Sequence, residues 1–416
     1  MRAISTTLIA CALACVMHAP IAEAQTETVL YSFCSQDYCA DGAYPHADLL
    51  NVKGTLYGTA SSGGANYGEC NNDDIACGVV FSLNPQTSVE TVIHSFGPGD
   101  GWEPLDGVIA VNGTLYGTTE DGGRGKWCSC GTVFSLNPTT GAEAVLYSFC
   151  GKKFCKDGSG PAADILAIGG SLYGTTGGGG GRHREGTVFS LDITNDTEIA
   201  LHSFGDRGSG GFAPRASLIN VNGTFYGTTV DGGKHGSGTV FSLDAATGKV
   251  RVVYSFCSQS HCADGSAPVA SLVNINGVLY GTTGDGGTGN CGNYGCGTVF
   301  SLNPVAGIET VLHSFQNDGK DGWWPFSGLT NVDGMLYGTT GDGGIGNCND
   351  NYADGCGTVF SVNPRTGTEK VIYSFQNNGT DGTNPVAGVI SIRGILYGTT
   401  EYGGSFGAGT VFSIVR

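Results

Sequence analysis

Aromatic side chains recur near prolines in this sequence, at positions where other copies of the same segment carry Ser, Gly, Ala or Asn. Flat aromatic faces can stack on the apolar faces of sugar rings, while nearby Asp and Asn side chains bond the hydroxyls. The alternative is that each aromatic residue packs on a neighbouring loop or covers a central opening. The candidate ligand-binding aromatics are Tyr44, Trp102, Phe212, Trp323 and Trp324.

Asp-Gly pairs precede most of these prolines and supply a second set of candidate ligand-binding residues. Asp-Gly closes tight turns well, so one interpretation is purely structural. The other is a ring of carboxylates and carbonyls that holds Ca²⁺ or polar ligand groups. The aspartates are Asp41, Asp100, Asp157, Asp264, Asp321 and Asp381, and a further set, Asp121, Asp231, Asp285 and Asp342, stands before Gly-Gly.

Signatures of catalysis and of metal binding are weak. The densest oxygen-rich segments, 317–321 and 71–74, do not match the spacing of an EF-hand loop, so the metal ligands are left unassigned. Ca²⁺ is the candidate ion, and no other cofactor is predicted. No Ser-His-Asp set, phosphate loop or zinc signature stands out. Paired carboxylates could support glycan hydrolysis or lyase chemistry, but the pattern favours binding, and no catalytic residue is predicted.

The cysteines fall in close pairs, which predicts local disulfides formed in an oxidising compartment. Equivalent segments without a pair lack both members, as in 177–185 and 205–211. Thiolate metal sites are the weaker alternative, because C-x₂-C spacing is absent. The pairs are Cys34/Cys39, Cys70/Cys77, Cys128/Cys130, Cys150/Cys155, Cys257/Cys262, Cys291/Cys296 and Cys348/Cys356.

Residues 1–24 predict a secretory signal peptide, with Arg2 at the start, an apolar run from Ile4 to Met17 and the cleavage pattern Ala22-Glu23-Ala24. Cys11 lies in a segment similar to a lipid-attachment box, but the apolar stretch before it is short, so lipoprotein anchoring is less favoured. No later stretch is long enough to span a bilayer. We expect a secreted, extracellular or periplasmic protein with residues 25–416 as a single domain.

Composition excludes several classes of protein. Glycine supplies 73 of the 416 residues without the G-X-Y period of collagen. Apolar residues make up 40 %, which is enough for a core and excludes wholesale disorder. The formal net charge of −17 repels phosphate backbones, so nucleic acid is not expected as a partner.

Three sequence markers each recur seven times in the same order, which predicts an all-β, seven-bladed β-propeller. Four short segments per unit, rich in β-branched and aromatic residues, predict four-stranded blades, as in 268–275, 278–283, 298–302 and 310–315. Small residues after each Pro are expected at the crowded centre. The His residues of the first marker are interpreted as packing residues rather than metal ligands. The markers are Tyr/His-Ser-Phe, from Tyr31, His94, Tyr147, His202, Tyr254, His313 and Tyr373; Tyr-Gly-Thr, from Tyr57, Tyr116, Tyr173, Tyr226, Tyr280, Tyr337 and Tyr397; and Gly-(Thr/Val)-Val-Phe-Ser, from Gly78, Gly131, Gly186, Gly238, Gly297, Gly357 and Gly409.

The two ends of the chain predict closure of the ring. The sequence after the signal peptide begins with the fourth strand of a unit, 27–33, and ends with the third, 409–415, so pairing them would complete one blade. In an up-and-down blade, the loops joining the second strand to the third and the fourth to the next blade open on one face, which we call the long-loop face. All 14 paired cysteines and all four Trp fall in these loops, where short disulfides would stiffen a binding surface. Binding residues commonly lie on loops carried by a rigid scaffold.

The repeating unit resembles the GloVer tandem repeat of secreted bacterial proteins, through its Leu-Tyr-Gly-Thr-Thr, Gly-Thr-Val-Phe-Ser-Leu and Tyr/His-Ser-Phe segments. The resemblance covers essentially all of the chain after residue 24. It implies a surface or released protein and brings no established activity or catalytic residues. The hairpin 131–141 also looks like quinoprotein-type propeller repeats, but it lacks their docking Trp and an adjacent Cys-Cys pair, so no quinone cofactor is expected.

These features together predict a non-catalytic, monomeric binding protein that uses its long-loop face, with a glycan as the ligand. Two alternatives remain. One is an envelope scaffold that binds another protein through the same face. The other is an extracellular glycan hydrolase or lyase.

Overall fold

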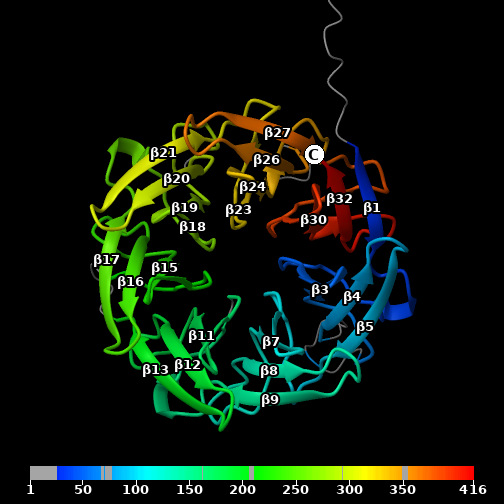
Figure 1. The fold of residues 1–416 in the computed structure, drawn as a ribbon, viewed down its shortest axis with the longest axis vertical. Coiled ribbons are helices and arrows are strands. Elements are labelled where there is room, and N and C mark those ends of the chain that lie inside the picture. Colours follow the sequence, from blue (N-terminus) through cyan, green and yellow to red (C-terminus); the bar gives the residue numbers. More distant parts are fainter. Residues whose placement is uncertain are drawn as a thin grey trace, which may run out of the picture.

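The chain forms a ring of seven four-stranded antiparallel sheets, which confirms the predicted propeller (Figure 1). The structure is a computed structural model that describes residues 26–66, 70, 77–161, 163–205, 210–292, 294–348 and 355–416. The expected signal peptide, Cys11 and the oxygen-rich segment 71–74 lie outside the described residues.

The strands of each blade follow one another from the centre of the ring to its rim. Blades 1 to 3 are β2 (Leu50–Val52), β3 (Thr55–Ala60), β4 (Val79–Asn84), β5 (Val89–Ser95); β6 (Ile109–Val111), β7 (Thr114–Thr119), β8 (Thr132–Leu136), β9 (Glu143–Ser148); and β10 (Leu166–Ile168), β11 (Ser171–Thr176), β12 (Thr187–Asp192), β13 (Thr197–Ser203). Blades 4 and 5 are β14 (Ile219–Val221), β15 (Thr224–Thr229), β16 (Thr239–Asp244), β17 (Lys249–Ser255); and β18 (Val273–Ile275), β19 (Val278–Thr283), β20 (Thr298–Asn303), β21 (Ile308–Ser314). Blades 6 and 7 are β23 (Thr330–Val332), β24 (Met335–Thr340), β26 (Thr358–Val362), β27 (Glu369–Ser374); and β29 (Ile390–Ile392), β30 (Ile395–Thr400), β32 (Thr410–Val415), β1 (Glu27–Ser32).

Short elements decorate the described parts of the long loops. Three 3₁₀ turns, η1 (Asp37–Cys39), η2 (Lys153–Cys155) and η3 (Ser260–Cys262), follow fourth strands. Two small ribbons pair β22 (Gly322–Trp323) with β25 (Asp342–Gly343) and β28 (Gly382–Thr383) with β31 (Tyr402–Gly403). Because the blades are up-and-down sheets, these elements and all seven disulfides lie on the long-loop side of the ring.

The two ends of the chain close the ring as predicted. Strand β1 pairs antiparallel with β32, from Glu27 opposite Ile414 to Ser32 opposite Thr410, and the two lie side by side in Figure 1. The pairing completes the seventh blade and removes a free sheet edge.

The innermost strands are shorter than predicted. Strand β18 begins at Val273, whereas the sequence pattern placed its start at residue 268. The residues between lie at the centre and bond to neighbouring blades instead of to their own sheet: the Ser217 amide donates to Ser271 Oγ at 3.1 Å. The small residues after each Pro therefore line the centre of the ring, as expected.

Pairs of buried phenylalanines join neighbouring blades. The Phe of each Tyr/His-Ser-Phe marker packs edge-on against the Phe in the third strand of the next blade, with ring centroids 5.0 to 5.3 Å apart. Phe315 and Phe360, for example, are both fully buried. The recurrence of two sequence markers is thus explained by one contact that is repeated at every blade junction.

The Tyr-Gly-Thr marker is explained by the same phenylalanines. In each blade its Gly stands opposite the Phe of the third strand, as Gly281 does to Phe300. A Cβ atom on Gly281 would lie 2.8 Å from Phe300 Cζ and 2.9 Å from Leu272 Cδ2. The ring occupies the space of the missing side chain, so only glycine fits.

We therefore expect Gly281→Ala to destabilise the protein by about 1–3 kcal/mol through overpacking. Thermal unfolding followed by circular dichroism would show a lower midpoint. Gly210→Ala is the matched control, because nothing lies within 4 Å of its Cβ position. Equal midpoints for the two variants would contradict the steric explanation.

Candidate functional site

A pocket of about 470 Å³ lies where the inner segments of all seven blades converge. Most of its lining comes from the residues just after each Pro, which stand at the long-loop end of the inner strands. The pocket therefore opens at the centre of the long-loop face, where loops from different blades can contribute to one ligand.

Three aspartates form one wall of this pocket. Asp48, Asp106 and Asp164 come from blades 1, 2 and 3 and line it together. The Gly388 amide donates to Asp48 Oδ1, and the Gly107 amide donates to Asp164 Oδ1 at 2.8 Å. Asp106 Oδ2 is buried and has no hydrogen-bond partner among the described residues. The wall thus depends on contacts between blades, including one between the first and the last.

The three carboxyl groups favour a partly protonated state. Burial raises the pKa of each, because a charge loses its solvation there. Repulsion from Asp164 raises the pKa of Asp106 further, whereas burial and the charge of Asp48 raise the pKa of Asp164 to about 7. At neutral pH the wall therefore offers both O–H donors and carboxylate acceptors to a ligand.

Aromatic and aliphatic side chains line the part of the pocket contributed by blades 5 to 7. Trp324 and Phe326 have ring centroids 5.1 Å apart, and Val269 and Val386 also line the pocket. Trp324 is 39 % exposed, so it is available to a ligand. The indole of Trp324 acts on the carboxyl of Asp285 in the preceding blade, where it partly offsets the rise in pKa that burial causes.

Charged side chains of both signs complete the lining. His46 Nε2 lies 3.0 Å from Glu401 Oε1, an ion pair between blades 1 and 7. Burial raises the pKa of Glu401, but the hydrogen bond and charge of His46 outweigh it and lower that pKa. Arg215 from blade 4 also lines the pocket, and its charge acts on Glu120. The pocket is therefore acidic, but Arg215 supplies a permanent positive charge.

The predicted aromatic residues do not all reach this pocket. Tyr44 and Trp324 directly precede their Pro, whereas Trp102, Phe212 and Trp323 stand two residues before it. Trp324 lines the pocket. The other four pack against buried clusters between the blades, and Tyr44 also meets Tyr402 edge-on at 5.5 Å. For these four, the structure shows packing, and a ligand-binding role stays a prediction.

The Asp-Gly aspartates lie on the rim of the ring, one at each of six blade junctions. Each carboxylate accepts a hydrogen bond from the Tyr or His of the preceding fourth strand, and each also accepts a backbone amide of the same loop, such as Gly151 N–H to Asp157 at 2.8 Å. They close their loops and do not converge on one ligand, so their ligand-binding role also stays a prediction. The pairs are Tyr31–Asp41, His94–Asp100, Tyr147–Asp157, Tyr254–Asp264, His313–Asp321 and Tyr373–Asp381.

The second aspartate set bonds to the aromatic segments. Asp121, Asp231 and Asp342 pair through their backbones with Trp102, Phe212 and Trp323. Within the segment 317–321, Asp318 accepts the amides of Lys320 and Asp321 at 2.9 Å, which is turn chemistry.

Comparison with known proteins confirms the resemblance of the repeat. The family model described as the Gloeobacter/Verrucomicrobia repeat matches residues 68–294 and 288–416. The chain belongs to this repeat family. No curated protein shows significant sequence similarity to this member of the Gloeobacter/Verrucomicrobia repeat family.

Solved structures share the fold of this repeat protein at low sequence identity. A quinohemoprotein alcohol dehydrogenase from Comamonas testosteroni has a TM-score of 0.52 at 14 % identity, over 94 % of this chain and 76 % of that one. An oligogalacturonate lyase in complex with manganese has a TM-score of 0.50 at 12 % identity, over 94 % and 96 %. A europium-containing methanol dehydrogenase also has a TM-score of 0.50 at 12 % identity, over 94 % and 93 %. At such identities the similarity shows the propeller fold alone.

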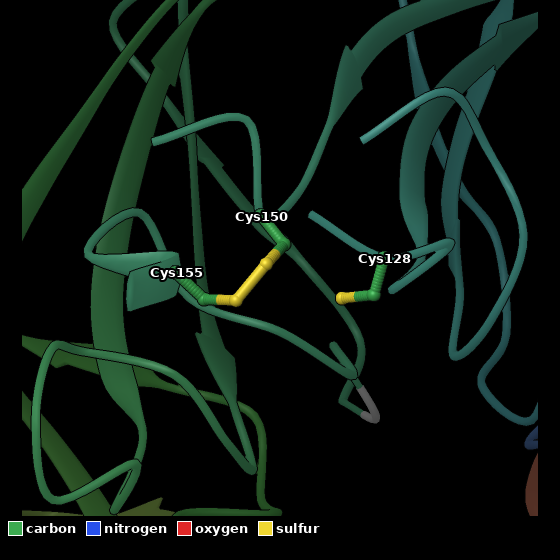
Figure 2. Close-up of side chains that lie close together, drawn as sticks. All are labelled: Cys128, Cys150 and Cys155. Atoms are coloured by element: carbon green, nitrogen blue, oxygen red, sulfur yellow. A yellow bond between two sulfur atoms is a disulfide. The ribbon is translucent and has the colours of Figure 1, made fainter. Parts of the chain in front are cut away.

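The cysteines of this repeat protein are paired as predicted, in seven local disulfides. Figure 2 shows Cys128 beside the Cys150–Cys155 disulfide, with sulfurs within 4.8 Å of one another. Cys128 is itself bonded to Cys130, so this cluster consists of two adjacent disulfides rather than free thiolates. The disulfides indicate an oxidising, extracellular or periplasmic location. No helix in the described part of the chain has the length and apolar character needed to cross a membrane.

Cys77 is buried although it lies in a long loop. Its predicted bond to Cys70 is present, but Cys77 is 1 % exposed and belongs to the hydrophobic cluster that contains Phe96 and Phe134. The residue stands just before β4, and its carbonyl accepts the amide of Glu103 in the next blade at 3.1 Å. Backbone bonding between blades draws Cys77 into their junction, so the Cys70–Cys77 disulfide extends the core and offers a ligand no surface at Cys77.

Sequence reasoning did not identify the aspartate wall. Asp48, Asp106 and Asp164 occupy positions that carry Ala, Ser or Gly in the other blades, and they were grouped with these small residues. The available signal was the charge itself: three adjacent units place an acidic group at the crowded centre, where a purely structural position would take a neutral residue.

Proposed function

We propose that this protein is an exported, non-catalytic binding protein that holds a glycan in the central pocket of its long-loop face. One observation carries the proposal: the pocket combines the exposed ring of Trp324 with the carboxyls of Asp48, Asp106 and Asp164. An aromatic face stacks on a sugar ring, and carboxyl groups of mixed protonation bond its hydroxyls as donors and acceptors.

The surrounding structure supports a preorganised site. The loops that frame the pocket are joined to neighbouring blades by backbone hydrogen bonds, such as Trp324 N–H to the Cys296 carbonyl at 3.2 Å. Cys296 belongs to a local disulfide with Cys291. A surface that is ordered before binding loses less entropy when the ligand arrives.

Binding to a glycan panel tests the proposal. We expect Trp324→Ala and Asp106→Ala each to weaken binding of a captured glycan about tenfold or more, which corresponds to about 1.4 kcal/mol. Trp127→Ala is the matched control, since Trp127 is exposed in a long loop but does not line the pocket. Binding that responds to Trp127 and not to Trp324 would place the site elsewhere on the face.

The same samples distinguish the alternatives. Asp106 and Asp164 are neighbouring carboxyls, and a raised pKa suits a general acid, which favours a glycan hydrolase or lyase as the second candidate. Release of shorter or unsaturated products by the wild type, lost in Asp106→Asn, would establish that candidate. Capture of an envelope protein without any glycan binding would favour the adhesion scaffold.

A further inference from the structure

Two of the blade junctions on the rim bring one histidine and two carboxylates together. At the junction of blades 1 and 2, His94 is the second-to-last residue of β5, Asp100 lies in the following loop and Glu143 begins β9. At the junction of blades 5 and 6, His313, Asp321 and Glu369 hold the same positions on β21, the following loop and β27. These junctions lie far from the central pocket in the fold, and the proposed function uses neither.

The local backbone aims these side chains at one another. A β-bulge in every fourth strand, just before the Tyr or His, shifts the register and turns that side chain towards the loop. Each glutamate stands opposite an apolar residue of its own third strand, as Glu143 does to Leu136. The repeat therefore places the histidine and the glutamate of each site on strands, and the aspartate in the loop between the two blades.

The ligand atoms at each junction are close enough to share one ion. One nitrogen or oxygen from each of the three side chains lies within 4.8 Å of the other two. His94 Nε2 to Asp100 Oδ2 and His313 Nε2 to Asp321 Oδ2 both measure 2.9 Å. First-row metal ions take N and O ligands at about 2.0–2.2 Å, so small side-chain movements would complete the coordination.

The glutamates of the blade junctions have oxygens that no described group satisfies. Glu143 Oε1, Glu369 Oε1 and Asp321 Oδ1 are buried without a hydrogen-bond partner among the described residues, and so are the Oε1 atoms of Glu27, Glu90, Glu198 and Glu309 at the junctions that carry Tyr. At the two His junctions an imidazole nitrogen joins the two carboxyl groups, and the three together form a possible ligand set for a cation. Buried carboxylates of this kind are normally paired with a charge or coordinated to a metal.

The other junctions of the same ring provide a natural comparison. Four of them carry Tyr in place of His, and the phenol donates a hydrogen bond of 2.7–2.8 Å to the aspartate. The junction of His202 carries Val250 in place of the glutamate. The first position of the Tyr/His-Ser-Phe marker thus accepts Tyr or His without a change of fold. Among the described blade junctions, only those of His94 and His313 combine an imidazole nitrogen with two carboxylates.

We propose that His94, Asp100 and Glu143, and likewise His313, Asp321 and Glu369, each bind one divalent transition-metal ion. One nitrogen and two carboxylate ligands suit Zn²⁺ or Mn²⁺ better than Ca²⁺, which prefers oxygen ligands only. The bound ion bridges the outer strands of two neighbouring blades. The His313 site is the tighter of the two, because Asp318 adds negative charge near Glu369, whereas Arg124 lines the surface hollow that holds Asp100 and Glu143.

Calorimetric titration of the chelator-treated protein with Zn²⁺ tests the proposal. The wild type is expected to bind two ions, and His94→Tyr and His313→Tyr each to bind one. The double variant, which copies the natural Tyr junctions and keeps every carboxylate, is expected to bind none. Because Tyr254 faces Asp264 and Glu309 in the same geometry, Tyr254→His is expected to add a third ion.

Two controls keep the test decisive. His202→Tyr should leave the stoichiometry unchanged, and unfolding midpoints in chelator should show that every variant is folded. Zn²⁺ should raise the midpoint of the wild type but not that of the double variant. Equal Zn²⁺ binding by the wild type and the double variant, no Zn²⁺ binding by the wild type, or Ca²⁺ binding that persists in the double variant and excludes Zn²⁺ would each overturn the proposal. Glycan binding is measured separately, so the two proposals can fail independently.

Discussion

Starting the chain at Phe33, so that β1 is removed, is expected to lower the midpoint of thermal unfolding by about 10 °C or more and to cause self-association. Strand β1 supplies the outer strand of blade 7 and pairs with β32 along its length. Without it, the backbone groups of β32 form a free edge, and the buried Val411 and Phe412 lose their cover on one side. Calorimetry and light scattering would measure the two effects.

A chain that starts at Thr26 is the control for this truncation, because it lacks the same N-terminal segment but keeps β1 whole. It should unfold like the chain of residues 25–416 and show no added self-association. An unchanged midpoint after removal of β1 would mean that the closure contributes little and that the other six blades hold the ring together.

The second large effect is a dependence of stability on pH. Burial, with repulsion from Asp381 and Asp41, raises the pKa values of Glu27 and Glu90 to about 8. Burial and repulsion from Asp264 raise that of Glu309 to about 7. All three glutamates lie at junctions that carry Tyr. The titratable groups that face them are Asp381 and Tyr373 for Glu27, Asp41 and Tyr31 for Glu90, and Asp264 and Tyr254 for Glu309.

These shifts make the folded protein more stable in mild acid. A glutamate with an ordinary pKa of 4.5 loses its proton first in the unfolded chain, so between about pH 4.5 and 8 the folded state binds more protons. Stability is therefore full below this window and falls as the pH rises through it. Burial lowers the pKa of His202 from its ordinary 6.5, which acts in the opposite direction, but it is one group against several.

We expect the unfolding midpoint to drop by several degrees between pH 5.5 and pH 8.5. The triple variant Glu27→Gln, Glu90→Gln and Glu309→Gln, which mimics the neutral carboxyls, should show a flatter profile. Asp196→Asn is the control, since this aspartate is exposed and its backbone conformation suits Asn. A wild-type midpoint that rises with pH over this range would contradict the assigned pKa shifts.

Patterns within one repeat predicted the strands well, and they failed where neighbouring blades meet. Strand β19 has the predicted bounds, because the Tyr-Gly-Thr segment and its partner lie in one blade. The inner strand β18 was placed five residues too early, because residues 268–272 bond across the centre and not within their sheet. The packing interpretation of His94 and His313 is correct for their rings, which meet Phe96 and Phe315 edge-on, but it missed the glutamates of the next blade.

The cysteines show the same difference between what one repeat determines and what the neighbouring blade determines. The spacing of Cys70 and Cys77 was enough to predict their bond, because both lie in one loop. The burial of Cys77 could not be predicted in this way, since the side chains that cover it include Phe134 of the next blade.

By itself, the sequence determined the propeller fold, its seven blades, its closure and the pairing of its cysteines, because each depends on short segments that recur with the same spacing. Only the tertiary structure decided which charged groups meet. Asp48 contacts Gly388 because the ring closes and brings the first and last blades together, and Asp106 interacts with Asp164 because their blades converge on one centre. The packing of neighbouring blades also sets the glutamate at the start of a fourth strand against the aspartate in the loop that follows the fourth strand of the preceding blade. The repeat specifies where a side chain stands in its blade, whereas the chemistry of the pocket and of the rim depends on which neighbour the ring places beside it.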